Sequence, residues 1–221
     1  MTAPPSAAPG ARIELVRQGP TKPWLGQLVP VDVSVWRPEG TTALEAFSFD
    51  DVVAAGMIAK WSEQAPPPDE RAEGETKFLV QHRTLLVFPQ SDGDLTVPPL
   101  VARWGEAATK HSVFVASKEL HFEAAIPAGA GDTLPLVASS VALEQTFDRN
   151  LSSLRVGDGF TRTITLRATD SDPIVFPELI LGGVSGMTAY SAGTLAESST
   201  ERGQIRASVT LIFHRGWVGR P

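Results

Sequence analysis

The sequence predicts an all-β protein made of two tandem β-sandwich domains, the second with fewer strands than the first. Short segments in which apolar and polar residues alternate strictly recur along the whole chain. Glycine and proline, 19 and 18 of the 221 residues, interrupt these segments too often for long helices. A stretch rich in Pro, Gly, Ala and Ser at 127–139 is expected to link the two sets.

The composition excludes several classes of function. Hydrophobic residues make up 42% and charged residues 20%, the balance of a folded chain. The formal net charge of -6 argues against non-specific binding to nucleic acid or to an anionic membrane. The absence of cysteine removes disulfides, thiolate nucleophiles and Cys-based metal sites. We expect no cofactor and no metal.

The first domain is expected over residues 11–126. Its clearest strand is 28–36, because every second residue from 29 to 35 is valine. Residues 52–61 fit a short helix or a strand, and the acidic, proline-rich segment 65–75 is expected to be an exposed loop. The turn at 89–94 contains Gly93, which can adopt a positive φ. The remaining strands expected here are 12–17, 43–49, 76–88, 95–97, 100–104, 112–116 and 119–125.

The second domain is expected over residues 140–221. Its clearest strand is 160–168, where Phe160, Ile164 and Leu166 alternate with threonines. The other strands expected in this domain are 141–147, 174–181, 186–192 and 205–213.

Two short matches in the same order indicate a tandem duplication, with convergence between similar strands as the alternative. The turn at Gly26 matches the turn at Gly157, and residues 83–88 match residues 208–213. About 37 residues follow Phe88 before the linker, but only eight follow Phe213. The second sandwich is therefore expected to lack its closing strand, and the natural polypeptide to continue beyond this chain. If it does not, a partner or a loop must shield the open edge.

The amino terminus has neither the basic nor the apolar region of an intact signal peptide. Residues 2–10 are mostly Pro, Ala and Ser and lead directly into the first strand. This pattern is typical of a mature secreted chain with Met1 added, the alternative being a cytosolic protein. No stretch reaches 18 apolar residues, so no transmembrane helix is expected in the chain.

No motif for catalysis is complete. The four histidines, His82, His111, His121 and His214, lack the spacing of a metal or zinc-protease motif. An enzyme would need a pocket that gathers carboxylates around a histidine such as His82 or His121. The chain is therefore expected not to be an enzyme.

The acidic and serine-containing motifs also have simpler interpretations. Residues 92–94 and 170–172 each hold two aspartates but lack the rest of a calcium loop, so we interpret both as turns. Residues 182–186 and 190–193 come close to a serine nucleophile elbow, but each misses a required position.

The tryptophans offer a second kind of site. Carbohydrate-binding surfaces use exposed aromatic rings as platforms. Three of the five tryptophans, Trp24, Trp61 and Trp217, would have to lie exposed on one face to form such a surface. Trp36 and Trp104 end or follow strands and are expected to cap the core.

Two segments together resemble a known family. The first runs from Glu73 to Leu100 and contains Phe-Pro-Gln, a glycine turn and a strand ending in Pro-Pro. The second comprises Ala142–Phe147 followed by Leu154–Ala168, which contains Arg-Val-Gly-Asp. Both resemble the BatD (oxygen-tolerance) family of bacterial envelope proteins, over most of residues 12–215. The second copy departs from the pattern at His214, where the first has proline.

The resemblance implies two immunoglobulin-like sandwiches in the periplasm, anchored to the inner membrane by a later helix. It implies a protein-interaction or scaffold role in envelope stress or oxygen tolerance, and no catalytic residues. The partners it implies are membrane proteins with von Willebrand factor A domains and, indirectly, a MoxR-type ATPase. The surface expected to bind a partner, by strand addition, is an open edge at 205–213. Its residues are Ile205, Ala207, Val209, Leu211 and Phe213.

Overall fold

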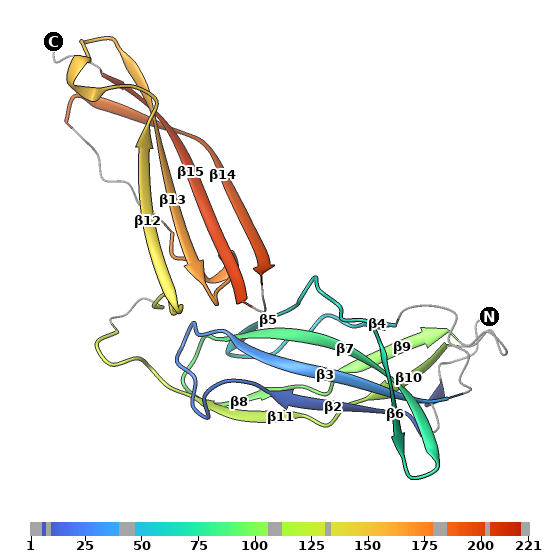
Figure 1. Ribbon diagram of the computed structural model, residues 1–221. Coiled ribbons are helices and arrows are strands. Elements are labelled where there is room, and N and C mark those ends of the chain that lie inside the picture. Colours follow the sequence, from blue (N-terminus) through green and yellow to red (C-terminus); the bar gives the residue numbers. More distant parts are fainter. Residues whose placement is uncertain are drawn as a thin grey trace. The chain divides into compact units, whose positions relative to one another are not determined.

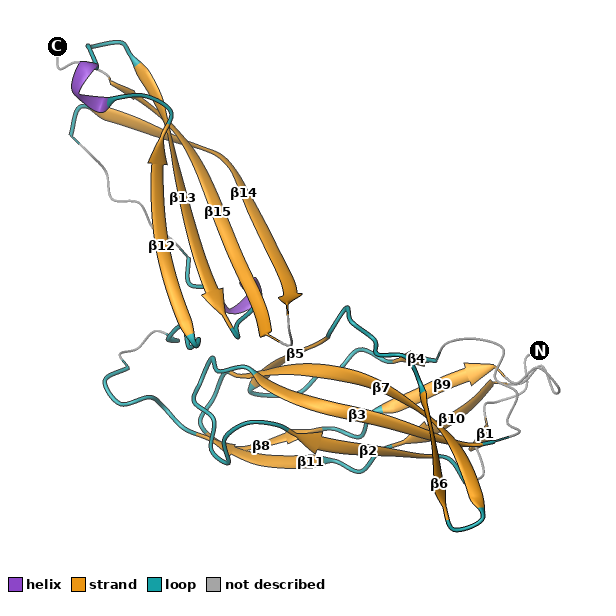
Figure 2. Ribbon diagram, in the orientation of Figure 1, coloured by secondary structure: helices purple, strands orange, loops and turns teal. Residues whose placement is uncertain are grey.

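The computed structural model describes residues 6–7, 10–39, 47–105, 112–130, 134–178, 185–201 and 204–217. These residues confirm the predicted all-β class, because they form several open sheets whose pairings are antiparallel except at a two-residue strand. The helices among them are two single 3₁₀ turns, η1 (Leu151–Ser153) and η2 (Pro173–Val175) (Figure 2). The chain divides into two compact units, Met1–Thr133 and Leu134–Pro221, and this boundary lies within the predicted linker.

The main sheet of the first unit has the strand order β2-β3-β7-β5 (Figure 1). The valines of β3 make it the buried centre of this sheet, between β2 and β7. A further strand, β6, pairs with the other half of the long strand β7. The bounds are β2 (Arg12–Arg17), β3 (Val29–Pro38), β5 (Met57–Trp61), β6 (Asp69–Glu73) and β7 (Thr76–Pro89).

Two smaller sheets complete the first unit. One has the order β1-β10-β9-β4, and the other is the pair β11-β8. Their strands are short because Pro98, Pro99 and the polar turns around them interrupt the ladders. The bounds are β1 (Ser6–Ala7), β4 (Ser48–Phe49), β8 (Gly93–Val97), β9 (Val101–Gly105), β10 (Ser112–Ala116) and β11 (Leu120–Ala124).

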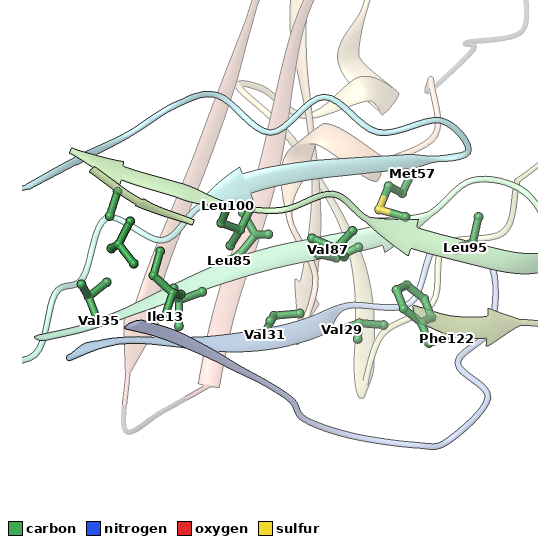
Figure 3. Close-up of a cluster of buried hydrophobic side chains, with 14 of the residues drawn as sticks. Ile13, Val29, Val31, Val35, Met57, Leu85, Val87, Leu95, Leu100 and Phe122 are labelled. Atoms are coloured by element: carbon green, nitrogen blue, oxygen red, sulfur yellow. The ribbon is translucent and has the colours of Figure 1, made fainter. Parts of the chain in front are cut away.

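The core of the first unit lies between the main sheet and the smaller sheets. The alternating valines of β3 are fully buried, as the sequence pattern predicts. Leu85 and Val87 of β7 lie on the same face, in one cluster with Leu95 and Phe122 of the smaller sheets and with Leu100, the residue before β9 (Figure 3). Trp104 belongs to this core as well, whereas Trp36 packs with Phe78 and Val80 in a separate cluster.

The second unit is one four-stranded antiparallel sheet of order β12-β13-β15-β14 (Figure 1). The central strands β13 and β15 pair over eleven consecutive residues, from Gly159 opposite Gly216 to Thr169 opposite Arg206. A β-bulge between Ser191 and Gly193 interrupts the pairing of β14 with β15. The bounds are β12 (Ser140–Phe147), β13 (Gly159–Thr169), β14 (Met187–Glu201) and β15 (Gln204–Trp217).

The two units share the order of their main sheets. β12, β13, β15 and β14 stand in the same chain order and pairing as β2, β3, β7 and β5. The register differs, however. In the first unit Val31 pairs with Leu85, and the sequence matches give Arg162 and Thr210 as their counterparts in the second unit. In the structure, however, Arg162 pairs with Phe213. The register therefore differs by three residues, an odd number, so the two pairs of matched segments do not present the same faces. The strand order is common to both units, and the duplication stays a prediction.

Several predicted elements need correction. The predicted loop 65–75 contains β6, which forms because Thr76–Pro89 extends past the main sheet and offers it a free edge. The predicted strand 174–181 is a 3₁₀ turn and an irregular segment as far as residue 178, because Pro173 and Pro177 remove ladder donors. Residues 52–61 resolve as a coil followed by strand β5. Residues 43–46 of the predicted strand 43–49 and residues 179–181 of the predicted strand 174–181 lie outside the described part of the chain.

Candidate functional site

The sheet of the second unit has one polar and one apolar face. Residues that stand directly opposite each other on paired strands share a face. The polar face carries Thr161 and His214, whose side chains are 3.1 Å apart (Oγ1 to Nδ1), and the hydrogen-bonded Thr165 and Thr210. The apolar face is formed at its centre by three cross-strand pairs: Ile164 with Leu211, Leu166 with Val209, and Ala168 with Ala207.

A hollow of about 480 Å³ opens on the apolar face. Its floor is Val209, Leu211 and Phe213 of β15 with Leu166 of β13. Its wall on the β14 side consists of small residues, so a ligand or a partner side chain can approach the floor closely. The residues that complete the lining are Pro173, Phe176, Pro177, Glu178, Ser191, Thr194 and Ala196.

The segment after β13 covers part of this face. Asp172 begins the turn η2 by accepting a hydrogen bond from the backbone N–H of Ile174 to its Oδ1 (3.1 Å). The turn contacts β14 and β15 and buries Val175. Farther along the face, Val141 and Leu143 of the outer strand β12 remain 52% and 64% exposed. The apolar face is therefore only partly covered in the part of the chain that the structure describes.

The predicted edge at 205–213 is not an edge. β15 pairs on one side with β13 and on the other with β14, so its backbone cannot accept an added strand. The reason is the length of β14, whose strand continues past the predicted 186–192 to Glu201 and covers β15. Of the five residues predicted to bind a partner, Ala207 is buried and Ile205 is half-buried. The other three, Val209, Leu211 and Phe213, form the floor of the hollow.

One end of the apolar face carries arginines. Arg215 stands opposite Phe160 and is buried. Arg162 stands opposite Phe213 and donates a hydrogen bond from Nη2 to Oε1 of Gln145 (2.8 Å). The apolar face therefore ends beside two arginine side chains.

The structure does not place the three candidate tryptophans on one surface. Trp24 is 51% exposed, in the loop before β3. Trp61 is half-buried and stacks on Phe49, with ring centroids 4.3 Å apart and packing against the core. Trp217 belongs to the second unit, and its side chain lies outside the described residues.

Three histidines stand opposite hydroxyl residues on a paired strand. His82 lies opposite Ser34, His121 opposite Thr96 and His214 opposite Thr161. The Nδ1 atom of His82 is 3.0 Å from Oγ of Ser34, and its Nε2 atom is 2.8 Å from Oδ1 of Asp69. The hydrogen bonds from His82 and Arg71 hold the pKa of Asp69 below its usual range.

The side chains of Ser34, His82 and Asp69 thus form a series of hydrogen bonds that has the same residue types as a hydrolase triad. Ser34 lies in the middle of β3, between β2 and β7, where backbone N–H groups belong to the ladders. No backbone donors are therefore available beside Ser34 for the oxyanion that acyl transfer needs. Thr96 and His121 repeat the arrangement with Glu119, 2.9 Å from Nε2 of His121. We interpret these chains as cross-strand contacts that stabilise the sheet surfaces.

The remaining motifs have structural roles where they are described. Ser191 of the 190–193 motif lies at the β-bulge, and Asp170 adopts a left-handed conformation (φ 57°) in the turn after β13. The earlier serine motif, 182–186, lies outside the described residues except for a turn at 185–186. Within the described ranges no group of three His, Asp or Glu side chains is arranged to hold a metal ion.

The wall of the hollow was not predicted. The sequence pattern that reveals it is a run of small residues on alternate positions of β14, Thr194, Ala196 and Ser198, which leave space above the apolar floor of β15. The segment that carries Phe176 and Pro177 was predicted as a strand, although it supplies the opposite wall.

Comparisons with protein-family models, with curated proteins and with solved structures gave no match to this chain. Over the described ranges, no helix has the length and apolar character needed to cross a membrane.

Proposed function

We propose that this chain is a non-enzymatic interaction and scaffold region of a BatD-like bacterial envelope protein. The observation that carries the proposal is the partly covered apolar face of the second unit, with its 480 Å³ hollow. Apolar surface of this kind is costly to leave in water and is a common feature of protein-binding sites. The BatD resemblance of the sequence gives the proposed compartment, the periplasm, and a membrane anchor beyond this chain.

The first unit indicates what such a face requires. Its main sheet has the same strand order, and there the equivalent apolar face is buried by β8 to β11. In the described part of the second unit the face has η2 and its flanking segment instead. We propose that both units are immunoglobulin-like sandwiches and that the second receives part of its covering layer from a partner.

The partner that we propose is a membrane protein with a von Willebrand factor A domain, linked indirectly to a MoxR-type ATPase. The hollow favours a partner that inserts apolar side chains between Phe176 and Ala196, onto the floor formed by Leu211. Such a contact combines a buried apolar centre with a polar rim, as in other protein interfaces.

A pull-down tests this function. The chain, immobilised as bait, is exposed to detergent-solubilised envelope proteins of the source bacterium. We expect specific recovery of a protein with a von Willebrand factor A domain, retained in high salt because the contact is apolar. Recovery of no envelope protein would contradict the scaffold function.

The alternative function is binding of a glycan or another small ligand through tryptophan. Its one supporting observation is the exposure of Trp24. A glycan array separates the two functions, since the alternative predicts binding that Trp24→Ala abolishes. Retained array binding together with an empty pull-down would favour the alternative.

A further inference from the structure

The two outer strands β2 and β12 occupy the same position in the two main sheets but differ in their protection. Each is the first strand of its sheet and pairs with one neighbour among the described residues. β2 carries Arg12, Glu14 and Arg17, and Arg12 forms an ion pair with Glu14 (2.8 Å). Charges on an outer strand discourage the pairing of further strands.

β12 has no such protection. Its sequence, Ser-Val-Ala-Leu-Glu-Gln-Thr-Phe, contains one charged residue, Glu144, which forms an ion pair with Arg167 of its own sheet. Val141 and Leu143, two of its apolar residues on the apolar face, are 52% and 64% exposed. The whole second unit, 134–221, contains no lysine, the residue that most often protects sheet edges. Over the described residues, β12 is thus an open edge strand with exposed apolar side chains.

The sequence of β12 is complementary to itself. Two copies of an antiparallel strand pair symmetrically about a two-fold axis. With Ala142 of each copy on this axis, Val141 stands opposite Leu143 of the other copy, and both pairs lie on the apolar face. In the same register Glu144 stands opposite Ser140, so the negative charges of the two copies do not meet. Apolar cross-strand pairs without opposed like charges stabilise a sheet.

From this complementarity we infer that the protein forms a homodimer through antiparallel pairing of β12 with β12 of a second copy. The pairing joins the two four-stranded sheets into one and extends the apolar face across the axis. It also satisfies the backbone N–H and C=O groups that β12 directs away from β13. The dimer goes beyond the proposed scaffold function and does not depend on it.

Sedimentation equilibrium of the full chain tests the dimer. We expect the average mass to rise from one chain to two with concentration. Leu143→Lys places a charge in both apolar pairs of the interface and should raise the dissociation constant of the dimer at least about tenfold. Leu195→Lys, at a 55% exposed leucine on the other outer strand β14, is the matched control and should dimerise as the unaltered chain does.

Disulfide cross-linking tests the register independently, because the chain contains no cysteine. Ala142→Cys places two thiols directly opposite each other, where paired Cα atoms lie about 4.5–5.5 Å apart, within disulfide range. Thr146→Cys is the control on the same face of the same strand, with its two copies about 27 Å apart in this register. We expect oxidation to cross-link the first variant and not the second.

Three results would each overturn the inference. The first is a monomer at every concentration, and the second is a dimer that Leu143→Lys leaves intact. The third is equal cross-linking of the two cysteine variants. Ala142 and Thr146 are both exposed on an outer strand, and circular dichroism of each cysteine variant shows whether the sheet is retained.

Discussion

At the scale of single residues, cross-strand polar contacts fix the surfaces of both units. Asp148 is an example from the second unit. Its Oδ1 accepts a hydrogen bond from the backbone N–H of Thr161 (2.9 Å), and its own N–H donates to the carbonyl of Thr161 (3.2 Å). This pair joins the end of β12 to the start of β13. The hydrogen bond from Thr161 holds the pKa of Asp148 below its usual range.

The variant Asp148→Asn keeps the acceptor and removes the charge. Because folding lowers the pKa of Asp148, its charged form stabilises the fold at pH values above the unfolded pKa, which is about 3.9. This contribution is lost as the pH falls through the folded pKa. We expect the variant to unfold at less urea at pH 7, and the difference between the two midpoints to shrink as the pH falls from 7 through the folded pKa of Asp148. A difference that stays constant over this range would contradict the assignment.

Gly56 and Gly74 form a matched pair in the first unit. Both have a positive φ, +72° and +60°. A Cβ on Gly56 would lie 2.2 Å from Oγ of Ser91 and 3.0 Å from Leu95, whereas a Cβ on Gly74 meets nothing within 4 Å. We expect Gly74→Ala to cost about 1–2 kcal/mol of unfolding free energy from backbone strain alone. Gly56→Ala should cost more, because Ser91 and Leu95 must move.

Urea titration of the two alanine variants measures both costs. Gly74→Ala serves as the reference for the cost of backbone strain, since its added Cβ contacts nothing within 4 Å. Equal losses in the two variants would show that Ser91 moves aside without cost, contrary to this account.

At the scale of elements, the sequence predicts most strands, because alternation is a direct consequence of a half-buried sheet. It identifies β3 and β13 well, since the alternating valines of β3 face one side and the apolar residues of β13 also share one side. It misses β6, whose residues are almost all charged or polar and which is held by pairing with β7 rather than by burial. Strand pairing depends on contacts that are distant in the sequence, and a pattern within one segment does not contain them.

The candidate site shows the same limit. The sequence singles out Val209, Leu211 and Phe213 as partner-binding candidates but places them on an edge, whereas in the structure they form the floor of the hollow. Their neighbour β14 extends to Glu201 and mixes small, polar and apolar residues on both faces, so its length is not visible as alternation. Deleting 205–213, a central strand of the sheet, is therefore expected to unfold the second unit and not merely to remove a binding edge.

At the scale of the whole molecule, each unit has its own sheets and its own buried residues. We expect two separate transitions in thermal unfolding. Leu85→Ala removes a fully buried side chain of the first unit and should destabilise that unit by about 2–5 kcal/mol. The transition of the second unit should stay in place. Calorimetry measures both, and a joint shift of the two transitions would contradict separate units.

Binding to the apolar face of the second unit is the central claim, and one comparison tests it most directly. Ala196→Arg fills the wall of the hollow from an exposed position, and Ser199→Arg places the same charge on the opposite face of the same strand. Both variants and the unaltered chain serve as baits for solubilised envelope proteins. We predict that Ala196→Arg loses the recovered partner and that Ser199→Arg retains it. Equal recovery by the two variants would show that the partner binds elsewhere and would contradict the account.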